Sequence, residues 1–201
     1  MPTSEIKKII DKNFVIDWHP RYDEIGIGDD YIEYKDLLQE VSKDISQGFI
    51  SELTFSKILE WKSPRVKGKI RKDDFEYYNE GIKHVLKSPE CEKLQILEDL
   101  QGIGVPVAST ILNFIYPDKF PIMDVRVTEV LCDFGYLKVK SRSPKNYIKF
   151  REVILTIVQE SDCSMRELDR ALFAYHKLKL KPKTKKEKSN CGSVNCPERI
   201  F

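Results

Sequence analysis

The stretch LEDLQGIGVPVA, residues 97–108, decides the fold, because it places two glycines between two segments with helical spacing of their apolar residues. Gly102 and Gly104 can turn the chain tightly, since glycine adopts positive φ without the clash of a Cβ atom. Pro106 suits the first turn of a helix, where no hydrogen-bonded N–H is lost, so the second helix is expected to begin near Val105. The stretch therefore predicts two helices joined by a tight hairpin.

Apolar residues recur at helical spacing along nearly the whole chain, and no segment predicts a strand. The spacing predicts a short first helix at residues 6–10, an irregular stretch at 15–30, and the helical hairpin at about 94–116. Further helices are expected over residues 34–41, 53–59, 75–85, 127–134, 147–157 and 164–175. A capping box at residues 164–167 opens the last helix, and Gly135 predicts the end of an earlier one. The expected fold is all-α.

The length of 201 residues fits one compact domain or two small lobes. Residues 1–178 are expected to form the helical domain, and residues 179–201 a basic, disordered tail. No apolar run is long enough for a transmembrane helix and no signal-peptide pattern is present, so we expect a cytoplasmic protein, nucleoid-associated if prokaryotic, that binds no membrane.

The net charge of +2 hides an uneven distribution, because residues 177–201 carry +6 and the preceding residues −4. Two further segments, residues 62–72 and 138–151, each hold six basic and no acidic side chains. Such runs are often only solvated surface. Because these two flank the hairpin in sequence, they also favour a face that binds DNA phosphates.

The hairpin and a single aspartate suggest where chemistry takes place. The backbone N–H groups of Gly102, Ile103 and Gly104 lie at the start of a helix, where free amides and the helix dipole can hold a phosphate. Asp124 lies twenty residues after Gly104 and is expected to cap another helix. A capping carboxylate is held rigidly, so it can also face a substrate.

These residues resemble the helix-hairpin-helix DNA glycosylase superfamily, which includes endonuclease III and adenine DNA glycosylase. The resemblance lies in the hairpin Leu100-Gln101-Gly102-Ile103-Gly104, the small residues Ala108-Ser109, and the segment Pro121-Ile122-Met123-Asp124-Val125-Arg126. It covers roughly residues 94–134 closely, and the all-helical plan is compatible with the family over about residues 30–177.

The resemblance implies an all-α fold of two helical lobes with a DNA cleft between them. It implies a base-excision DNA repair or base-removal enzyme that acts as a monomer on double-stranded DNA with a flipped base. The expected reaction is hydrolysis of the N-glycosidic bond of a damaged, mismatched or modified base. Asp124 is then the catalytic carboxylate, and Gly102, Ile103 and Gly104 hold phosphate. Further DNA contacts are expected from five basic side chains: Arg126, Lys62, Arg65, Lys67 and Lys69.

The chain departs from the family at two places. Bifunctional members carry a nucleophilic lysine two residues after the second hairpin glycine, where this chain has Pro106, so the resemblance implies a monofunctional enzyme that uses water. Cys191 and Cys196 match neither the number nor the spacing of the family's iron–sulfur loop, so we expect no cofactor and no metal. The other three cysteines are expected to be buried thiols: Cys91, Cys132 and Cys163.

Two other kinds of protein remain open from the sequence. The first is a non-catalytic helix-hairpin-helix protein that binds DNA, and the second is a helical domain that binds other proteins without a steep salt dependence. Individual residues also have two interpretations. Trp61 can stack on a flipped base or lie in the core, and Arg126 can contact phosphate or pair with Glu129. Lys119 is expected to be an exposed loop charge.

Overall fold

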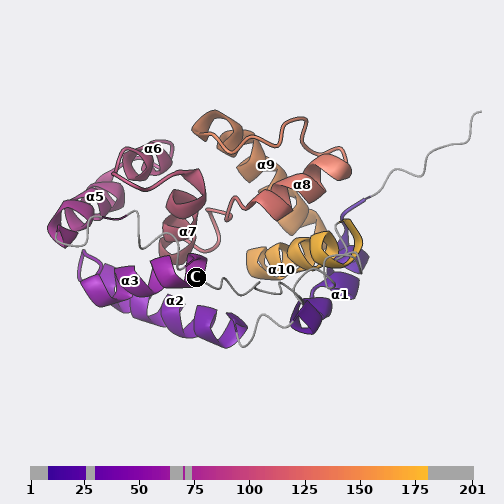
Figure 1. Cartoon of the computed structure of the whole chain (residues 1–201), viewed down its shortest axis with the longest axis horizontal. Helices are drawn as coiled ribbons and strands as arrows, with labels where there is room; N and C mark the ends of the chain where they lie inside the picture. The colour runs from indigo at the N-terminus through magenta and orange to yellow at the C-terminus, as the bar shows by residue number, and fades with distance from the viewer. Residues whose placement is uncertain (1–8, 26–29, 64–69, 71–73, 181–201) are drawn as a thin grey trace, which may run out of the picture.

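A computed structural model describes residues 9–25, 30–63, 70 and 74–180, and every regular element in this part of the chain is a helix (Figure 1). The expectation of an all-α fold is therefore confirmed. The expected disorder of the basic tail concerns residues that lie almost entirely outside the described ones. Residues 176–180, which directly precede that part, form a turn of π-helix, η2 (His176–Leu180).

The helices form two groups, which lie at the left and right of Figure 1. Each helix packs mainly against others of its own group. The first group contains α2 (Asp30–Ser46), α3 (Glu52–Lys62), α5 (Phe75–Lys87), α6 (Lys93–Glu98) and α7 (Val105–Ile115). The second contains α1 (Lys12–Trp18), the 3₁₀ helix η1 (Pro20–Ile25), α8 (Val125–Asp133), α9 (Pro144–Ser161), α10 (Met165–Tyr175) and η2. Because α1 packs against α10, the second group is built from both ends of the described chain.

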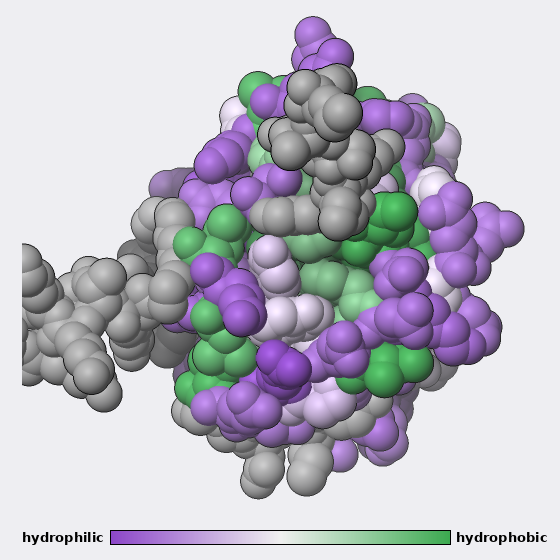
Figure 2. Space-filling view, turned by 90° about the vertical axis from the view of Figure 1, so that its right-hand side faces the viewer, coloured by the Kyte–Doolittle hydropathy of each residue, from purple (hydrophilic) through white to green (hydrophobic). Residues whose placement is uncertain are grey.

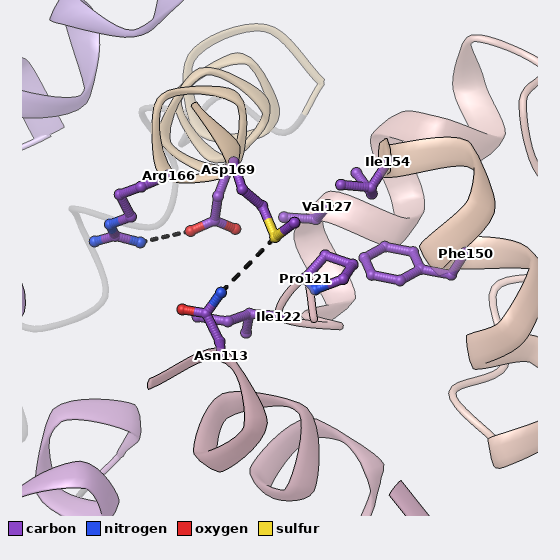
Figure 3. Close-up of a pocket in the computed structure, with 9 residues that line it drawn as sticks. Asn113, Pro121, Ile122, Val127, Phe150, Ile154, Arg166 and Asp169 are labelled. Carbon is purple, nitrogen blue, oxygen red and sulfur yellow. Dashed lines mark hydrogen bonds and ion pairs between the residues drawn. The ribbon is translucent and has the colours of Figure 1, made fainter. Parts of the chain in front are cut away.

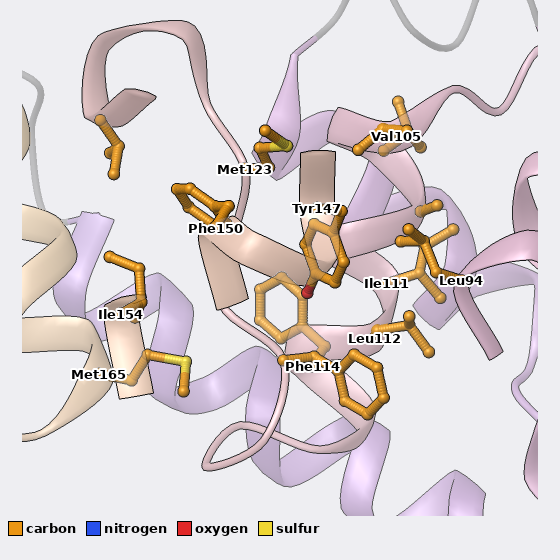
Figure 4. Packing of buried hydrophobic residues seen from close by; sticks show 14 of the residues in the cluster. Leu94, Val105, Ile111, Leu112, Phe114, Met123, Tyr147, Phe150, Ile154 and Met165 are labelled. Carbon is orange, nitrogen blue, oxygen red and sulfur yellow. The ribbon is translucent and has the colours of Figure 1, made fainter. Parts of the chain in front are cut away.

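Helix α7 runs through the core of the first group and packs against α2, α3 and α6. It begins at Val105 with Pro106 in its first turn, as the sequence predicts. Nine of its eleven residues are buried, which explains its mostly apolar sequence. Its three polar residues, Ser109, Thr110 and Asn113, are buried as well and donate hydrogen bonds to backbone carbonyls. Figure 4 shows Ile111, Leu112 and Phe114 of this helix in the same core as Tyr147 and Phe150 of α9. The second helix of the hairpin is therefore a central element of the fold.

The N-terminal part of the chain differs from the sequence prediction. Residues 15–25 were expected to be irregular, but α1 and η1 occupy this region, and the described residues Ile9 and Ile10 precede the first helix. The Asp11 side chain caps α1 by accepting a hydrogen bond from the N–H of Phe14 at 2.9 Å. The Phe14 ring then packs against Phe134 at 5.4 Å between ring centroids. Contacts with residues distant in sequence stabilise this short helix, and apolar spacing alone does not reveal them.

The predicted helix ends are confirmed at two places. Gly135 follows α8 with φ of +77°, the left-handed conformation that glycine adopts readily after a helix. Ser164 and Glu167 form the expected capping box, in which each side chain binds the backbone N–H of the other residue. Local sequence therefore determines both ends.

Glu167→Gln should lower the stability of the protein at neutral pH by about 0.3–1.5 kcal/mol, the usual contribution of one capping interaction. Hydrogen bonds from the Ser164 backbone and hydroxyl lower the pKa of Glu167 below its ordinary value of 4.5. Since the folded carboxylate has the lower pKa, its stabilisation is present above pH 4.5 and is lost as the pH falls through the folded pKa. Thermal unfolding at neutral and acid pH should therefore show a difference from wild type that shrinks in acid.

Glu160→Gln is a matched control, because Glu160 is an exposed glutamate near the end of α9. We expect it to unfold like wild type at both pH values. A deficit of Glu167→Gln that stayed constant down to acid pH would show that the carboxylate charge does not stabilise the cap.

Figure 2 looks onto the end of the molecule at the right of Figure 1, where α1, α8 and α10 lie. Hydrophilic side chains form most of this surface, and smaller apolar areas lie between them. Exposed apolar side chains of the N-terminal segment include Ile9 and Ile16. Among the described helices, none has the length and apolar character that crossing a membrane requires.

Candidate functional site

The two helices and the tight turn of the hairpin are present as predicted, but only one of the two glycines has the positive φ expected of both. Gly102 has φ of +81°, whereas Gly104 has φ of −100° and caps α7 with an extended backbone. Ile103 is buried, and its N–H donates to the carbonyl of Leu100 at 3.1 Å. Both glycines are exposed, and their amides have no acceptor among the described residues. The two glycine amides are thus the hairpin N–H groups that could still receive an anion, while the amide of Ile103 is used within the turn.

Helix α5 holds the hairpin in place. The Tyr78 hydroxyl donates to the carbonyl of Gln101 at 2.9 Å, and the N–H of Gln101 donates to the Tyr77 hydroxyl at 3.3 Å. Gly81 lies so close to the hairpin that a Cβ atom there would approach Cδ1 of Leu100 to 2.7 Å. Sequence reasoning missed these three residues, because nothing in the spacing of α5 connects it with a turn twenty residues later.

Asp124 caps α8, as the sequence predicts. Its Oδ1 accepts a hydrogen bond from the N–H of Arg126 at 2.9 Å, and its own backbone is extended. The preceding residue is tied to α7, because the buried N–H of Met123 donates to Oγ of Ser109 at 3.0 Å. One hydrogen bond thus connects the helix that follows the hairpin with the backbone that carries the carboxylate.

Ser109→Ala should destabilise the protein by about 1–3 kcal/mol, because it leaves the buried N–H of Met123 without its acceptor. Urea unfolding measures the loss. Thr156→Ala is the matched control, since the exposed Thr156 hydroxyl on α9 donates only to a carbonyl one turn earlier. This control should stay within about 0.5 kcal/mol of wild type. Equal losses for the two variants would mean that Ser109 does not hold the Asp124 segment.

Lys62, the last residue of α3, meets Asp124 across the two helix groups. Its Nζ lies 3.6 Å from Oδ2 of Asp124, and the Arg126 guanidinium lies 3.6 Å from Oδ1. The side chains of Lys62 and Asp124 are only 14% and 22% exposed. Burial lowers the pKa of Lys62 below its ordinary value, an effect that the carboxylates of Asp124 and Asp169 oppose. The sequence predicted Lys62 as a surface contact to DNA, but its amine lies in the interior of the site.

A pocket of about 210 Å³ surrounds this ion pair. We call it the carboxylate pocket. Its basic and acidic side chains are Lys62, Arg126, Arg166, Asp124 and Asp169, which leaves one positive charge in excess when all are ionised. Its other lining residues are Tyr22, Trp61, Ile122 and Phe173. The pocket is therefore lined by both aromatic and charged side chains, and residues from α3, α8, α10 and η1 contribute to it.

Arg166 and Asp169 form an ion pair on one face of α10, with a shortest N–O distance of 2.5 Å (Figure 3). The Arg166 guanidinium also lies 4.8 Å from the ring centroid of Tyr34 and 5.1 Å from that of Trp61. Burial raises the pKa of Asp169, whereas the neighbouring Arg166 and Lys62 lower it. Sequence reasoning did not select this pair, and the three-residue spacing is the only signal that could have found it.

Trp61 serves the core and the pocket together. Its ring packs against Phe114 at 5.1 Å and against Tyr34 at 5.6 Å, which agrees with the core interpretation of the sequence. It also lines the carboxylate pocket. The two aromatic neighbours therefore support the ring in the position in which it lines the pocket.

The other basic side chains that were predicted to contact DNA lie outside the described residues or form ion pairs within the protein. Arg65, Lys67 and Lys69 lie outside the described residues. In the second basic run, Arg151 pairs with Glu90 and donates to the carbonyl of Lys119, which ties it to the protein itself. Arg126 pairs with Asp124, and Glu129 lies 2.7 Å from Nε2 of His176 instead.

Lys119 and the three cysteines of the described residues differ in how far they are exposed. Lys119 is an exposed loop charge, as predicted, and lies 3.4 Å from Glu90. Cys91 was expected to be buried but is exposed, because it lies in the turn just before α6 and not within the apolar stripe. Cys132 and Cys163 are partly buried, and burial raises the pKa of Cys163 to about 11.

The described residues contain no group of three histidine, cysteine or acidic side chains that could hold a metal ion. Cys191 and Cys196 lie outside this part of the chain. Comparisons of the chain with models of protein families, with curated proteins and with solved structures found no match. The functional proposal therefore depends on the residues of the carboxylate pocket and of the hairpin.

Proposed function

We propose that this protein removes a base from double-stranded DNA by hydrolysing its N-glycosidic bond, and that its two helix groups are the lobes of a helix-hairpin-helix DNA glycosylase. The observation that carries the proposal is the position of Asp124. Its carboxylate is fixed by an N-cap hydrogen bond and lies in the carboxylate pocket, to which both helix groups contribute. The α7 hydrogen bond between Ser109 and Met123 connects this carboxylate with the hairpin helix.

The chemistry fits a single carboxylate. Cleavage of an N-glycosidic bond develops positive charge on the sugar, and a nearby carboxylate stabilises that charge. The same carboxylate can orient the water that attacks C1′ and accept its proton. Lys62 and Arg126 each lie 3.6 Å from a different oxygen of Asp124, so they keep the carboxylate in one orientation.

The surroundings of Asp124 fit a base that has left the DNA stack. An extruded base needs a pocket with flat, apolar walls, and the carboxylate pocket offers Tyr22, Trp61 and Phe173. The DNA backbone must be held while the base is outside the helix. The exposed amides of Gly102 and Gly104 at the start of α7 are suited to a phosphate. We expect the protein to act as a monomer.

A panel of short labelled duplexes tests the proposal. The members carry uracil, thymine opposite guanine, 8-oxoguanine, adenine opposite 8-oxoguanine, or an alkylated purine. After incubation with the full chain, hot alkali converts every abasic site into a strand break, so base removal is detected whatever happens to the site afterwards. We expect breaks with at least one member of the panel.

A different outcome would favour a different class of protein. Salt-sensitive binding to the duplexes without any break would support a non-catalytic DNA-binding protein that uses only the hairpin amides. Absence of both breaks and salt-sensitive binding would contradict a DNA partner altogether.

A further inference from the structure

The carboxylate pocket is lined by three basic side chains but only two acidic ones. Arg126 contacts Asp124, and Arg166 contacts Asp169, so each acidic side chain has an arginine beside it. Lys62 is the additional cation, and its side chain is only 14% exposed. Burial of an ammonium group costs free energy because the charge loses its hydration. Lysine, unlike arginine, can lose its proton in such a place.

The position of the Lys62 amine suits a reaction with the sugar. Asp124 is the carboxylate that the proposed function places beside C1′, and Nζ of Lys62 lies 3.6 Å from it. A sugar atom held on the Oδ2 side of Asp124 would therefore also lie near Nζ. Base removal leaves an abasic deoxyribose whose ring-opened form has an aldehyde at C1′, and a neutral amine beside an aldehyde forms an imine.

We propose that Lys62 is a second catalytic residue, whose amine forms an imine with C1′ of the abasic sugar and thereby cleaves the DNA strand. This inference rests on the proposed function, since it requires that sugar to be bound at Asp124. It goes beyond the expectation drawn from Pro106, which excludes a lysine only at that hairpin position. Here the amine comes from the end of α3, in a different part of the sequence and of the fold.

The steps of this reaction balance without a redox partner. The neutral amine adds to the C1′ aldehyde, and its surplus proton passes by way of Asp124 to the aldehyde oxygen, which becomes a hydroxyl. This hydroxyl takes one further proton from solvent and leaves as water, so the imine is formed in its protonated state. The imine then promotes loss of the C2′ proton to solvent. The electron pair forms the C2′–C3′ double bond, and the C3′–O3′ bond breaks with release of the phosphate. One water hydrolyses the imine and restores Lys62.

Burial supports this role because it lowers the pKa of Lys62 and so increases the share of neutral amine. The charged groups that face the amine come from two other helices. Asp124 and Asp169 favour the protonated form, and Arg126 opposes it. Asp124 therefore lies where it can accept a proton from the amine after the bond to C1′ has formed.

Borohydride trapping on an abasic duplex tests the proposal without knowledge of the lesion. The substrate is a duplex whose single uracil has been removed beforehand, mixed with the full chain and sodium borohydride. Hydride adds to C1′ of an imine and leaves a stable covalent adduct, visible on a denaturing gel. We expect an adduct with wild type, and peptide mapping should place it on Lys62.

Two variants and one control complete the test. Lys62→Gln and Lys62→Arg should both reduce the adduct to the background seen with undamaged DNA, and the arginine variant keeps the charge beside Asp124. Lys57→Gln is the matched control, because Lys57 lies on the same helix and pairs with Glu40 at 2.6 Å outside the carboxylate pocket. This control should form the adduct like wild type, and thermal unfolding should show all three variants folded.

The outcomes separate this inference from the proposed function. No adduct with wild type, or an adduct that persists in both Lys62 variants, would overturn the role of Lys62 and leave base removal to be judged by the lesion panel. An adduct that depends on Lys62, together with no base release from any lesion, would support Lys62 and contradict the proposed glycosylase.

Discussion

Asp124→Asn should reduce the rate of base release from the substrate found in the lesion panel by about 10²–10⁴-fold, the usual contribution of a charge-stabilising or general-base group. The substitution removes the negative charge that opposes the developing positive charge on the sugar. It keeps the size of the side chain, and asparagine also caps helices well, so the start of α8 should persist. DNA affinity should change little, because phosphate binding is expected from the hairpin amides. Single-turnover rates and gel-shift titrations measure the two quantities.

Asp118→Asn is the matched control, because this exposed aspartate lies in the loop between α7 and α8 and undergoes the same change of charge. It should release the base at the wild-type rate. Thermal unfolding of both variants is needed as well, since Asp124→Asn leaves Lys62 and Arg126 beside a neutral amide. Equal rates for wild type and a folded Asp124→Asn would eliminate the carboxylate from the mechanism.

The parts of the site that could be predicted from sequence are those that local conformation decides. Gly102 adopts the positive φ that the hairpin requires, and Pro106 occupies the first turn of α7. Asp124 caps α8, because an aspartate before an apolar helical stripe has a hydrogen bond to the first turn available. In each case the residue and its near neighbours suffice, and no distant contact is needed.

The parts that sequence reasoning missed depend on contacts between distant segments. Lys62 begins a basic run and was therefore predicted on the surface, yet the end of α3 directs its amine to Asp124, 62 residues later. Arg166 and Asp169 enter the same pocket from α10. Charge patterning finds the basic run but does not show which of its members faces inward, because that depends on how the two helix groups meet. The cluster of charged side chains in the pocket is thus a property of the tertiary structure.

Ile111→Ala should destabilise the protein by about 2–5 kcal/mol, the usual cost of removing most of a large aliphatic side chain from a packed core. Ile111 is 0% exposed and lies on α7, which packs against three other helices of the first group. Figure 4 shows it in the same part of the core as Leu94 and Leu112. The substitution loses the transfer free energy of the removed side-chain atoms. It also leaves a cavity whose lining atoms lose their contacts. Urea unfolding measures the loss.

Leu53→Ala is the control for this prediction, because Leu53 on α3 is 67% exposed and should cost no more than about 0.5 kcal/mol. The comparison also bears on the site. Helix α7 connects the hairpin glycines at its start with Ser109, which holds the backbone before Asp124. If Ile111→Ala cost no more than Leu53→Ala, α7 would not be fixed in the core. The carboxylate would then lack the rigid support that placing one charge beside a developing cation requires.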